Sequence, residues 1–210
     1  MALIAISGWI GSGKDTVADY LISKHNFERE SLAASLKDAI SSIFSWDRDM
    51  VEGKTDEARL IREAADEWWS QKLGIPNFSP RLAMQLVGTE IMRNQFHRDI
   101  WVFSLESRLK TRQDESLVIT DCRFRNELAV IKRVHGKTIW VRRGPLPSWY
   151  DIAILANAGS ESSIQKLTEL GIHESEWNWV GYDFDCIIDN DGSLQELHQK
   201  IEKALVHLNN

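Results

Sequence analysis

The sequence predicts an α/β protein whose central, mostly parallel sheet is covered by helices on both faces. Short apolar runs, each suited to one buried strand, alternate along the 210 residues with segments of helical periodicity. The first run, Leu3–Ser7, leads through a glycine-rich turn straight into a helical segment. A chain of this length can remove roughly 70% of its unfolded surface from water, which is enough for one sizeable core. Alternation of this kind is typical of a parallel sheet.

Several elements carry clear start or stop signals. Gly8 stops the first strand, and Gly74 ends a strongly helical segment. Ser79 and Pro80 start another helix, because serine is a favoured N-cap and proline fits the first turn. The expected strands cover residues 3–7, 27–32, 117–120, 137–141 and 184–188, and the expected helices cover 14–24, 35–44, 56–73, 80–91, 99–110, 125–134 and 193–208.

One stretch departs from this alternation. Between Arg142 and Val180 the periodicity weakens, prolines and Gly159 interrupt it, and no strand is expected. The stretch is too long for a simple connection, so it predicts either a lid or an inserted helical segment. We expect residues 1–210 to form one domain, in which 142–180 is this lid or insertion and 45–112 is a helical substrate-binding region.

Composition and charge exclude several classes of protein. The net charge is −6, whereas a surface that binds duplex nucleic acid normally needs a basic face. A local basic pocket for a small phosphorylated ligand is compatible with this balance. No apolar run approaches the roughly 20 residues that span a bilayer, and the apolar start lacks the basic flank of a secretory signal. Cys122 and Cys186 lack CxxC spacing, so we expect reduced thiols in a cytoplasmic protein, with a disulfide as the weaker alternative.

Residues 8–16, Gly-Trp-Ile-Gly-Ser-Gly-Lys-Asp-Thr, fit a phosphate-binding loop between the first strand and the first helix. The glycines let backbone amides turn toward phosphate oxygens, and the helix adds its N-terminal dipole. Lys14 places a cation near the β- and γ-phosphates of a nucleoside triphosphate. Asp15 stands where the usual pattern has serine or threonine, so the hydroxyl of Thr16, a candidate Mg²⁺ ligand, comes one residue late. The alternative is a glycine-rich turn without a ligand, which this coincidence of features disfavours.

A second polar group follows the expected strand at 117–120. Asp121 emerges at its carboxyl end, where open α/β sheets bind ligands, and could hold Mg²⁺ through water or accept a hydrogen bond from substrate. Arg123 suits bidentate recognition of phosphate, and Glu127 suits a base edge or a sugar hydroxyl. Together these residues indicate a kinase with a phosphorylated acceptor. The alternative is a solvated helix start with an aspartate cap.

A third polar group lies on the helix that begins at Ser79. Arg81, Gln85 and Thr89 are spaced four residues apart, so they would share one helical face. A polar stripe of this kind is more often only the solvated face of an amphipathic helix. Lys37, inside a mostly apolar stretch, is equally ambiguous by itself.

Several stretches resemble the phage-type deoxynucleoside monophosphate kinases, a family of P-loop nucleoside monophosphate kinases. They follow one another in family order from end to end of the chain, and the segments Thr-Asp-x-Arg-Phe-x-Asn-Glu and Asn-Asp-Gly-Ser are more specific than the phosphate loop. Between 142 and 179 the similarity is confined to the opening arginines and residues 173–176. The similar stretches are 7–19, 32–40, 81–89 continuing to 98–102, 118–127 and 188–197.

This resemblance implies a P-loop kinase fold, a three-layer α/β/α sandwich with a lid or helical insertion. It implies a transferase that moves the γ-phosphoryl group of ATP onto a deoxynucleoside monophosphate for DNA synthesis. In such enzymes the residues that match Lys14 and its loop bind ATP, and the turn that matches Asn190–Gly192 passes near the adenine. Asp15 also matches the family pattern, which turns the apparent departure into support. The acceptor side is lined by the residues that match Lys37, Arg81, Asp121, Arg123 and Glu127.

Phosphoryl transfer needs alignment, exclusion of water and neutralised charge more than covalent help from the protein. We expect the loop amides, Lys14 and Mg²⁺ to hold ATP, while Arg81 and Arg123 hold the acceptor phosphate. Arg142 and Arg143 begin the weakly patterned stretch, so either could swing onto the transition state as a lid closes.

The expected site residues include these groups and two aromatic candidates for a contact with the base. Trp101 is a candidate by resemblance, and Trp149 by its position near the expected lid. The catalytic residues are Lys14, Asp15, Arg81, Arg123, Arg142 and Arg143. The ATP contacts are Gly11, Ser12, Gly13, Lys14, Asp15, Thr16, Asn190 and Gly192. The acceptor contacts are Lys37, Arg81, Gln85, Trp101, Asp121, Arg123, Glu127 and Trp149. The Mg²⁺ ligands are Thr16 and Asp121, directly or through water.

Two alternative functions stay open at this point. One is another small-molecule P-loop kinase, of the dephospho-coenzyme A or phosphomevalonate type, and the other is a nucleoside triphosphate switch without acceptor chemistry. The expected partners are ATP and a deoxynucleoside monophosphate in the cytoplasm (the host's, if the protein is phage-encoded), without duplex nucleic acid or a membrane. The accepted bases, the discrimination against ribose and the choice between monomer and homodimer are open.

Overall fold

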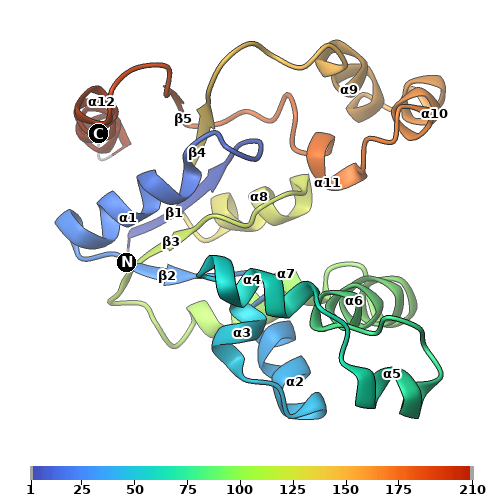
Figure 1. Cartoon of the computed structure of the whole chain (residues 1–210). Coiled ribbons are helices and arrows are strands. Elements are labelled where there is room, and N and C mark those ends of the chain that lie inside the picture. Colours follow the sequence, from blue (N-terminus) through green and yellow to red (C-terminus); the bar gives the residue numbers. More distant parts are fainter. Residues whose placement is uncertain (1, 209–210) are drawn as a thin grey trace. The chain divides into compact units, whose positions relative to one another are not determined.

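A computed structural model describes residues 2–208, and these fall into two compact units (Figure 1). The first unit is built from both ends of the chain, up to Ser31 and again from Arg108 onward. The second unit is Leu32–Ser107, and it therefore starts before the helical region expected at 45–112.

The first unit is organised around a five-stranded sheet in the order β2-β3-β1-β4-β5. Every pairing is parallel, so the predicted parallel sheet is confirmed. Because the strands are parallel, their carboxyl ends all meet at one edge of the sheet. The strands are β1 (Ala2–Ser7), β2 (Glu28–Glu30), β3 (Ser116–Ile119), β4 (Lys137–Arg142) and β5 (Cys186–Asp189).

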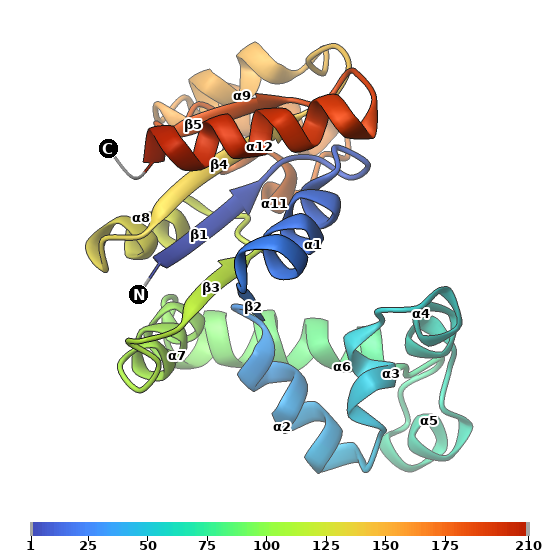
Figure 2. The ribbon, with the colours of Figure 1, turned by 90° about the vertical axis from the view of Figure 1, so that its left-hand side faces the viewer.

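Helices cover both faces of this sheet, which gives the predicted three layers (Figure 2). On one face, α1 (Lys14–His25) and α12 (Leu194–Leu208) share a buried apolar cluster with Ile4 and Ile6 of β1. On the other face, α8 (Arg125–Arg133) packs against β1 and β4. The alternation of β1 side chains between the two faces follows from the period of two of a strand.

The weakly patterned stretch after β4 is helical. It forms α9 (Tyr150–Asn157), α10 (Glu161–Glu169) and α11 (Glu174–Trp177), and α9 packs against α10. The sequence predicted either a lid or an inserted helical segment, and the secondary structure of this stretch is helical.

The second unit is helical throughout its regular structure. Its core combines Leu36, Ile40, Val51, Phe78 and Ala83 with partly buried aromatic side chains. The elements are α2 (Ala34–Phe44), α3 (Arg48–Glu52), α4 (Asp56–Glu63), α5 (Glu67–Leu73), α6 (Pro80–Gln85), a π-helix (Leu86–Phe96) and α7 (Ile100–Leu109), whose last two residues belong to the first unit.

The single helix expected at 56–73 is wrong, because the chain breaks between α4 and α5. Asp66 causes a new helix start: one carboxylate oxygen accepts from the backbone N–H of Trp69 at 3.0 Å, and the other accepts from Nε1 of Trp46 at 2.8 Å. An aspartate in extended conformation that caps the next turn ends the preceding helix as it starts the following one. The apolar periodicity on both sides hides this break in the sequence.

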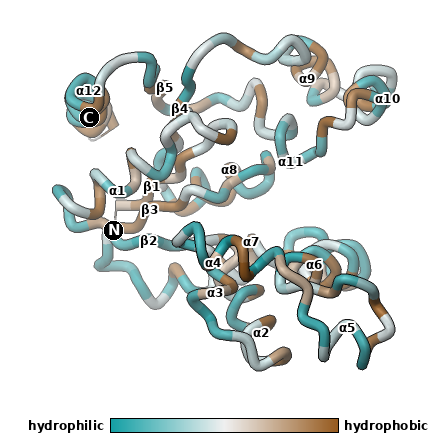
Figure 3. Tube along the Cα trace, in the orientation of Figure 1, coloured by the Kyte–Doolittle hydropathy of each residue, from teal (hydrophilic) through white to brown (hydrophobic). Residues whose placement is uncertain are grey.

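The distribution of hydropathy agrees with the fold, since hydrophobic residues lie along the central strands β1 and β3 (Figure 3). Within residues 2–208, none of the helices has both the length and the apolar character needed to cross a membrane. Cys122 and Cys186 are both free thiols, so the weaker alternative of a disulfide is wrong.

Candidate active site

Most of the predicted site residues in the first unit gather at the carboxyl edge of the sheet. The phosphate loop follows β1, Asp121 and Arg123 follow β3, Arg143 follows β4, and Asn190 follows β5. The register aligns these ends, since Ser7 pairs with Trp140 and Arg142 pairs with Asp189. Segments that are distant in the sequence therefore converge on one ligand-binding edge.

The phosphate loop is held in an open, turned conformation by its glycines. Gly11 and Gly13 have φ values of +78° and +96°, in the left-handed region that side chains disfavour. A Cβ atom on Gly13 would also collide with the side-chain amide of Asn190. That amide donates to the carbonyl of Ser12 at 2.9 Å and so joins the turn after β5 to the loop.

Ser12 carries a buried hydroxyl that lacks a partner. The residue is only 3% exposed, and its Oγ makes no hydrogen bond to any of the described residues. A buried polar atom without a hydrogen-bond partner costs free energy, so it gains from a ligand that can supply one. A phosphate oxygen seated in the loop would give this hydroxyl an acceptor.

Lys14 is folded back onto its own loop. Its Nζ donates to the carbonyl of Trp9 at 2.9 Å. Burial lowers the pKa of Lys14, the nearby charge of Arg123 lowers it further, and Asp15 and Glu176 act in the opposite direction. Two cations therefore face the same region, which is the electrostatic setting for a phosphate group.

Asp15 contacts residues of β2 and of the segment directly after β3. Its Oδ1 accepts from Arg29 at 3.0 Å and from the Thr120 hydroxyl at 3.3 Å, and Arg29 also bridges to Asp19 at 2.8 Å. In this geometry Asp15 anchors the start of α1 to β2 and β3. The adjacent Thr16 is exposed, so its hydroxyl is accessible to a metal ion.

The residues after β3 divide into two roles. Asp121 accepts a hydrogen bond from Ser31 Oγ at 2.6 Å, and Arg123 Nη1 donates to Glu176 Oε1 at 2.9 Å. Glu127 is only 3% exposed, and its Oε2 accepts from the backbone N–H groups of Arg123 at 2.7 Å and Phe124 at 3.1 Å. Glu127 thus has a capping role that fixes the backbone carrying Arg123, and its predicted contact with substrate stays a prediction.

The two arginines that open the helical stretch differ in their surroundings. Arg142 makes a two-pronged pair with Asp189, through Nε to Oδ1 and through Nη2 to Oδ2 at 3.1 Å, and lies 5.4 Å from the ring of Trp140. This pair lowers the pKa of Asp189 and raises that of Arg142. Arg143 is exposed to solvent.

Trp9, inside the phosphate loop, is the centre of an aromatic cluster. Its ring lies 4.9 Å from Trp179, 5.8 Å from Trp140, 5.9 Å from Trp149 and 6.2 Å from Tyr150, measured between centroids. Edge-to-face pairs of this kind add to the stability gained by burial. Trp149, predicted as a base contact, thus lies against the loop itself.

Four predicted residues lie in the second unit. Lys37 Nζ donates to Glu52 Oε1 at 2.6 Å, and Arg48 occupies the other carboxylate oxygen at 2.6 Å. Trp101 Nε1 donates to the carbonyl of Gly88 at 2.9 Å. Arg81 and Gln85 are exposed, and Arg81 Nε is 4.0 Å from Glu63.

The expected single α-helical face through Arg81, Gln85 and Thr89 is wrong. The α-helix ends at Gln85, and a π-helix starts at Leu86. Its i→i+5 hydrogen bonds change the angular spacing of the side chains, so Thr89 leaves the line set by the other two.

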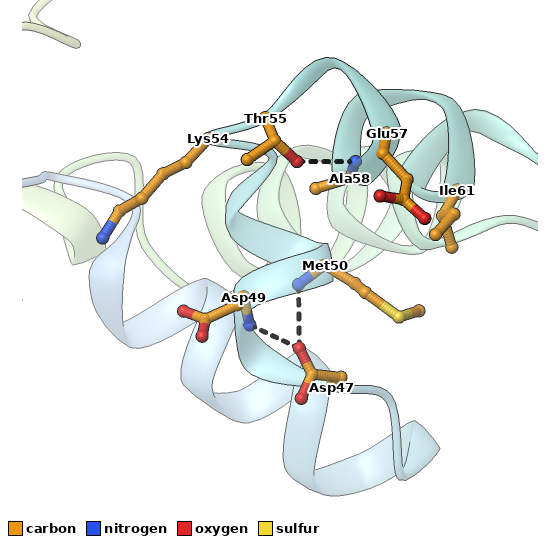
Figure 4. A pocket seen from close by; sticks show the side chains of 8 residues that line it. All are labelled: Asp47, Asp49, Met50, Lys54, Thr55, Glu57, Ala58 and Ile61. Carbon is orange, nitrogen blue, oxygen red and sulfur yellow. Dashed lines mark hydrogen bonds between the residues drawn. The ribbon is translucent and has the colours of Figure 1, made fainter.

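The second unit also has an open pocket of about 560 Å³ on α3 and α4 (Figure 4). Two of its polar side chains cap helix starts: Asp47 accepts from the N–H groups of Asp49 and Met50, and Thr55 accepts from that of Ala58. Three of its eight lining side chains are carboxylates, which is unsuited to a phosphate. None of the predicted site residues lines it.

Comparison with known proteins identifies the family of this chain. A family model described as deoxynucleotide monophosphate kinase matches residues 49–201. The chain belongs to this family. Deoxynucleotide monophosphate kinases of Escherichia phage RB69 and Enterobacteria phage T4 are 27% and 24% identical to it, over 98% of this chain and 100% and 99% of theirs. A deoxynucleoside-5'-monophosphate kinase of Escherichia phage T5 is 27% identical over 63% of this chain and 72% of its own.

In this member of the deoxynucleotide monophosphate kinase family, four residues that the sequence alone did not single out form ion pairs with predicted site residues. Arg29, Glu52, Glu176 and Asp189 each pair with a predicted site residue. Arg29 and Glu52 lie outside the stretches that resemble the family, whereas Glu176 and Asp189 lie inside two of them. The resemblance at 173–176 and at 188–197 was the sequence signal for these two, but it gave neither of them a role.

Proposed function

We propose that this member of the deoxynucleotide monophosphate kinase family transfers the γ-phosphoryl group of ATP to a deoxynucleoside monophosphate, which yields the deoxynucleoside diphosphate and ADP for DNA synthesis. One observation carries the proposal. The phosphate loop, with its half-buried lysine and its unpartnered Ser12 hydroxyl, lies at the same sheet edge as Asp121 and Arg123. A site for triphosphate and a cation for a second phosphate therefore share one edge.

On the donor side, the loop amides and Lys14 bind the phosphates of ATP, and the Ser12 hydroxyl donates to one of their oxygens. The turn at 190–192 lies beside the adenine. Thr16 and Asp121 offer the hard oxygen ligands that Mg²⁺ prefers, and Thr16 is exposed while Asp121 is half-buried, so they fit the ion directly or through water. Mg²⁺ supplies charge neutralisation at the β- and γ-phosphates when bound.

On the acceptor side, the guanidinium of Arg123 binds the acceptor phosphate, because a planar fork of N–H donors matches phosphate oxygens. Glu127 acts through the backbone of Arg123. We assign a base contact to Trp149. In the second unit, the residues assigned to the acceptor are Lys37, Arg81, Gln85 and Trp101.

The segment 142–180 acts as the lid. Arg143, which is exposed, is the arginine that moves onto the transferring group, while Arg142 stays paired with Asp189. The reaction takes place in the cytoplasm, where both substrates are dissolved, and involves no duplex nucleic acid. Light scattering in solution measures whether the working form is a monomer or a homodimer.

A panel of acceptors tests this function. Purified protein is mixed with ATP, Mg²⁺ and each deoxynucleoside or ribonucleoside monophosphate in turn, and diphosphate products are separated chromatographically. We expect a diphosphate from at least one deoxynucleoside monophosphate and its loss in Lys14→Ala. ATP hydrolysis that ignores every monophosphate would indicate a switch, and phosphorylation only of dephospho-coenzyme A or phosphomevalonate would indicate another kinase.

A further inference from the structure

Glu176 lies where three parts of the phosphate site meet. Its Oε1 accepts from Arg123 Nη1 at 2.9 Å, and its backbone carbonyl accepts from Nε1 of Trp9 at 3.1 Å. The carbonyl of Trp9 in turn accepts from Lys14 Nζ at 2.9 Å. One residue of α11 is thus connected to the phosphate loop, to its lysine and to the arginine that follows β3.

The charges around Glu176 explain why a carboxylate is useful there. The positive charge of Arg123 lowers the pKa of Lys14, and the negative charge of Glu176 raises it, so the three groups interact. Two cations that face one region repel each other until an anion arrives. The carboxylate of Glu176 supplies that negative charge in the protein alone.

The ion pair between Arg123 and Glu176 is exposed, so a phosphate can replace Glu176 as the partner of Arg123. The side chains of Arg123 and Glu176 are 45% and 28% exposed. Ion pairs this accessible to water are weak, whereas a phosphate can engage a guanidinium bidentately and carries more charge. The bond from Trp9 to the Glu176 backbone does not depend on this exchange.

We propose that Glu176 is a positioning residue that stands in for phosphate, holding Arg123 at the site before substrate arrives and releasing it to the bound phosphate. The proposal rests on the proposed function, in which Arg123 binds the acceptor phosphate. Because the carboxylate must be displaced, it weakens phosphate binding by the strength of its own pair with Arg123.

Glu176→Gln removes the charge and keeps the backbone carbonyl that holds Trp9. Glu174→Gln is the matched control, since Glu174 is exposed on the same short helix and accepts instead from Asn178. Binding of inorganic phosphate, the group that Arg123 is proposed to bind, is followed by tryptophan fluorescence, with Trp9 as the reporter in the loop. An exposed pair corresponds to about a two- to fivefold change in an equilibrium constant, so Kd should fall by that factor in Glu176→Gln and stay unchanged in Glu174→Gln.

A double-mutant cycle separates this role from a merely structural one. In an Arg123→Ala background, Glu176→Gln should leave Kd unchanged. In turnover, Glu176→Gln should lower KM for the deoxynucleoside monophosphate by the same factor at unchanged kcat. Glu176→Asp, which keeps the charge but shortens its reach, gives an intermediate Kd and serves if the glutamine variant fails to fold.

An unchanged or raised Kd in folded Glu176→Gln, or the same fall in the Arg123→Ala background, would overturn the proposal. The measurement of Kd does not require the protein to catalyse a reaction. If the wild-type protein binds inorganic phosphate but makes no diphosphate from any monophosphate, the proposed function fails, and the Kd values still decide the role of Glu176.

Discussion

Asn190 donates its side-chain amide to the carbonyl of Ser12 at 2.9 Å, across a separation of 178 residues in the sequence. This bond joins the turn after β5 to the phosphate loop after β1. Gly13 lies next to the same amide, and a Cβ atom there would force the Asn190 side chain to shift and so disturb this bond. The shape of the loop therefore depends on both ends of the chain.

We expect Gly13→Ala to weaken ATP binding far more than Gly11→Ala. Both positions have positive φ, so both substitutions carry backbone strain, which costs on the order of 1 kcal/mol. Only the new methyl group at Gly13 meets Asn190, because nothing lies within 4 Å of a Cβ at Gly11. Calorimetric titration with ATP measures the difference, which should be at least about tenfold.

Asn190→Ala in the Gly13→Ala background supplies the control for that comparison. It removes the colliding amide, so part of the lost affinity should return. Equal losses in the two glycine variants would contradict the assignment of this contact.

The two arginines after β4 should respond differently to alanine. Arg143→Ala should lower kcat by at least about a hundredfold if Arg143 acts on the transferring group, since arginines in that role contribute three or more decades. Arg142→Ala should mainly lower thermal stability, because it frees Asp189. Steady-state kinetics and thermal melts of both variants measure this, and normal kcat in both would refute the lid assignment.

Glu52 should make stability depend on pH. Burial opposes the shift, but hydrogen bonds from Lys37 and Arg48 lower the pKa of Glu52 below its ordinary value of 4.5. The folded-state pKa is therefore below the unfolded one, so this stabilisation is complete above about pH 4.5 and is lost as the pH falls through the folded pKa. Urea unfolding at a series of pH values measures it.

Glu52→Gln should lower the free energy of unfolding by about 1–3 kcal/mol at pH 7, with the difference from wild type vanishing in acid. Glu57→Gln, at an exposed position of the neighbouring α4, should leave the pH profile parallel to that of wild type. A constant difference for Glu52→Gln down to pH 3 would contradict the pairing.

Because the pKa of Lys14 is lowered, kcat/KM for ATP should begin to fall at a lower alkaline pH than an ordinary lysine would give. This ratio reports on ionisations of the free enzyme. Lysine loses its charge above its pKa, so this alkaline limb of the pH profile should lie below the ordinary 10.5 of lysine. Arg123→Gln removes the neighbouring cation and should move the limb to higher pH. An identical limb in both proteins would show that the two charges do not interact.

Much of the first unit could be predicted from sequence because its signals are local. An apolar run, a glycine turn and a lysine at a fixed offset identify β1, the loop and α1 together. The partners Glu176 and Asp189 could not be predicted, because they meet Arg123 and Arg142 only through the tertiary fold. A carboxylate in a helix or strand has no pattern that distinguishes pairing from exposure to solvent.

The errors have the same origin. The capping role of Glu127 was missed, because it arises only where the fold buries the carboxylate against the backbone of Arg123. Asp66 is one of many acidic residues in an amphipathic stretch, and only its contacts with Trp46 and Trp69 identify the helix break. The π-helix after Gln85 also leaves no mark in a pattern of apolar spacing.

A single-turnover experiment with ATP labelled at the γ-phosphate tests the central claim most directly. Enzyme in excess over labelled ATP is mixed with a deoxynucleoside monophosphate and Mg²⁺, and the label is followed into products. We predict that the label appears in the deoxynucleoside diphosphate and that Lys14→Ala slows this transfer by at least about a hundredfold. Label released only as inorganic phosphate, or transfer at the wild-type rate in Lys14→Ala, would contradict it.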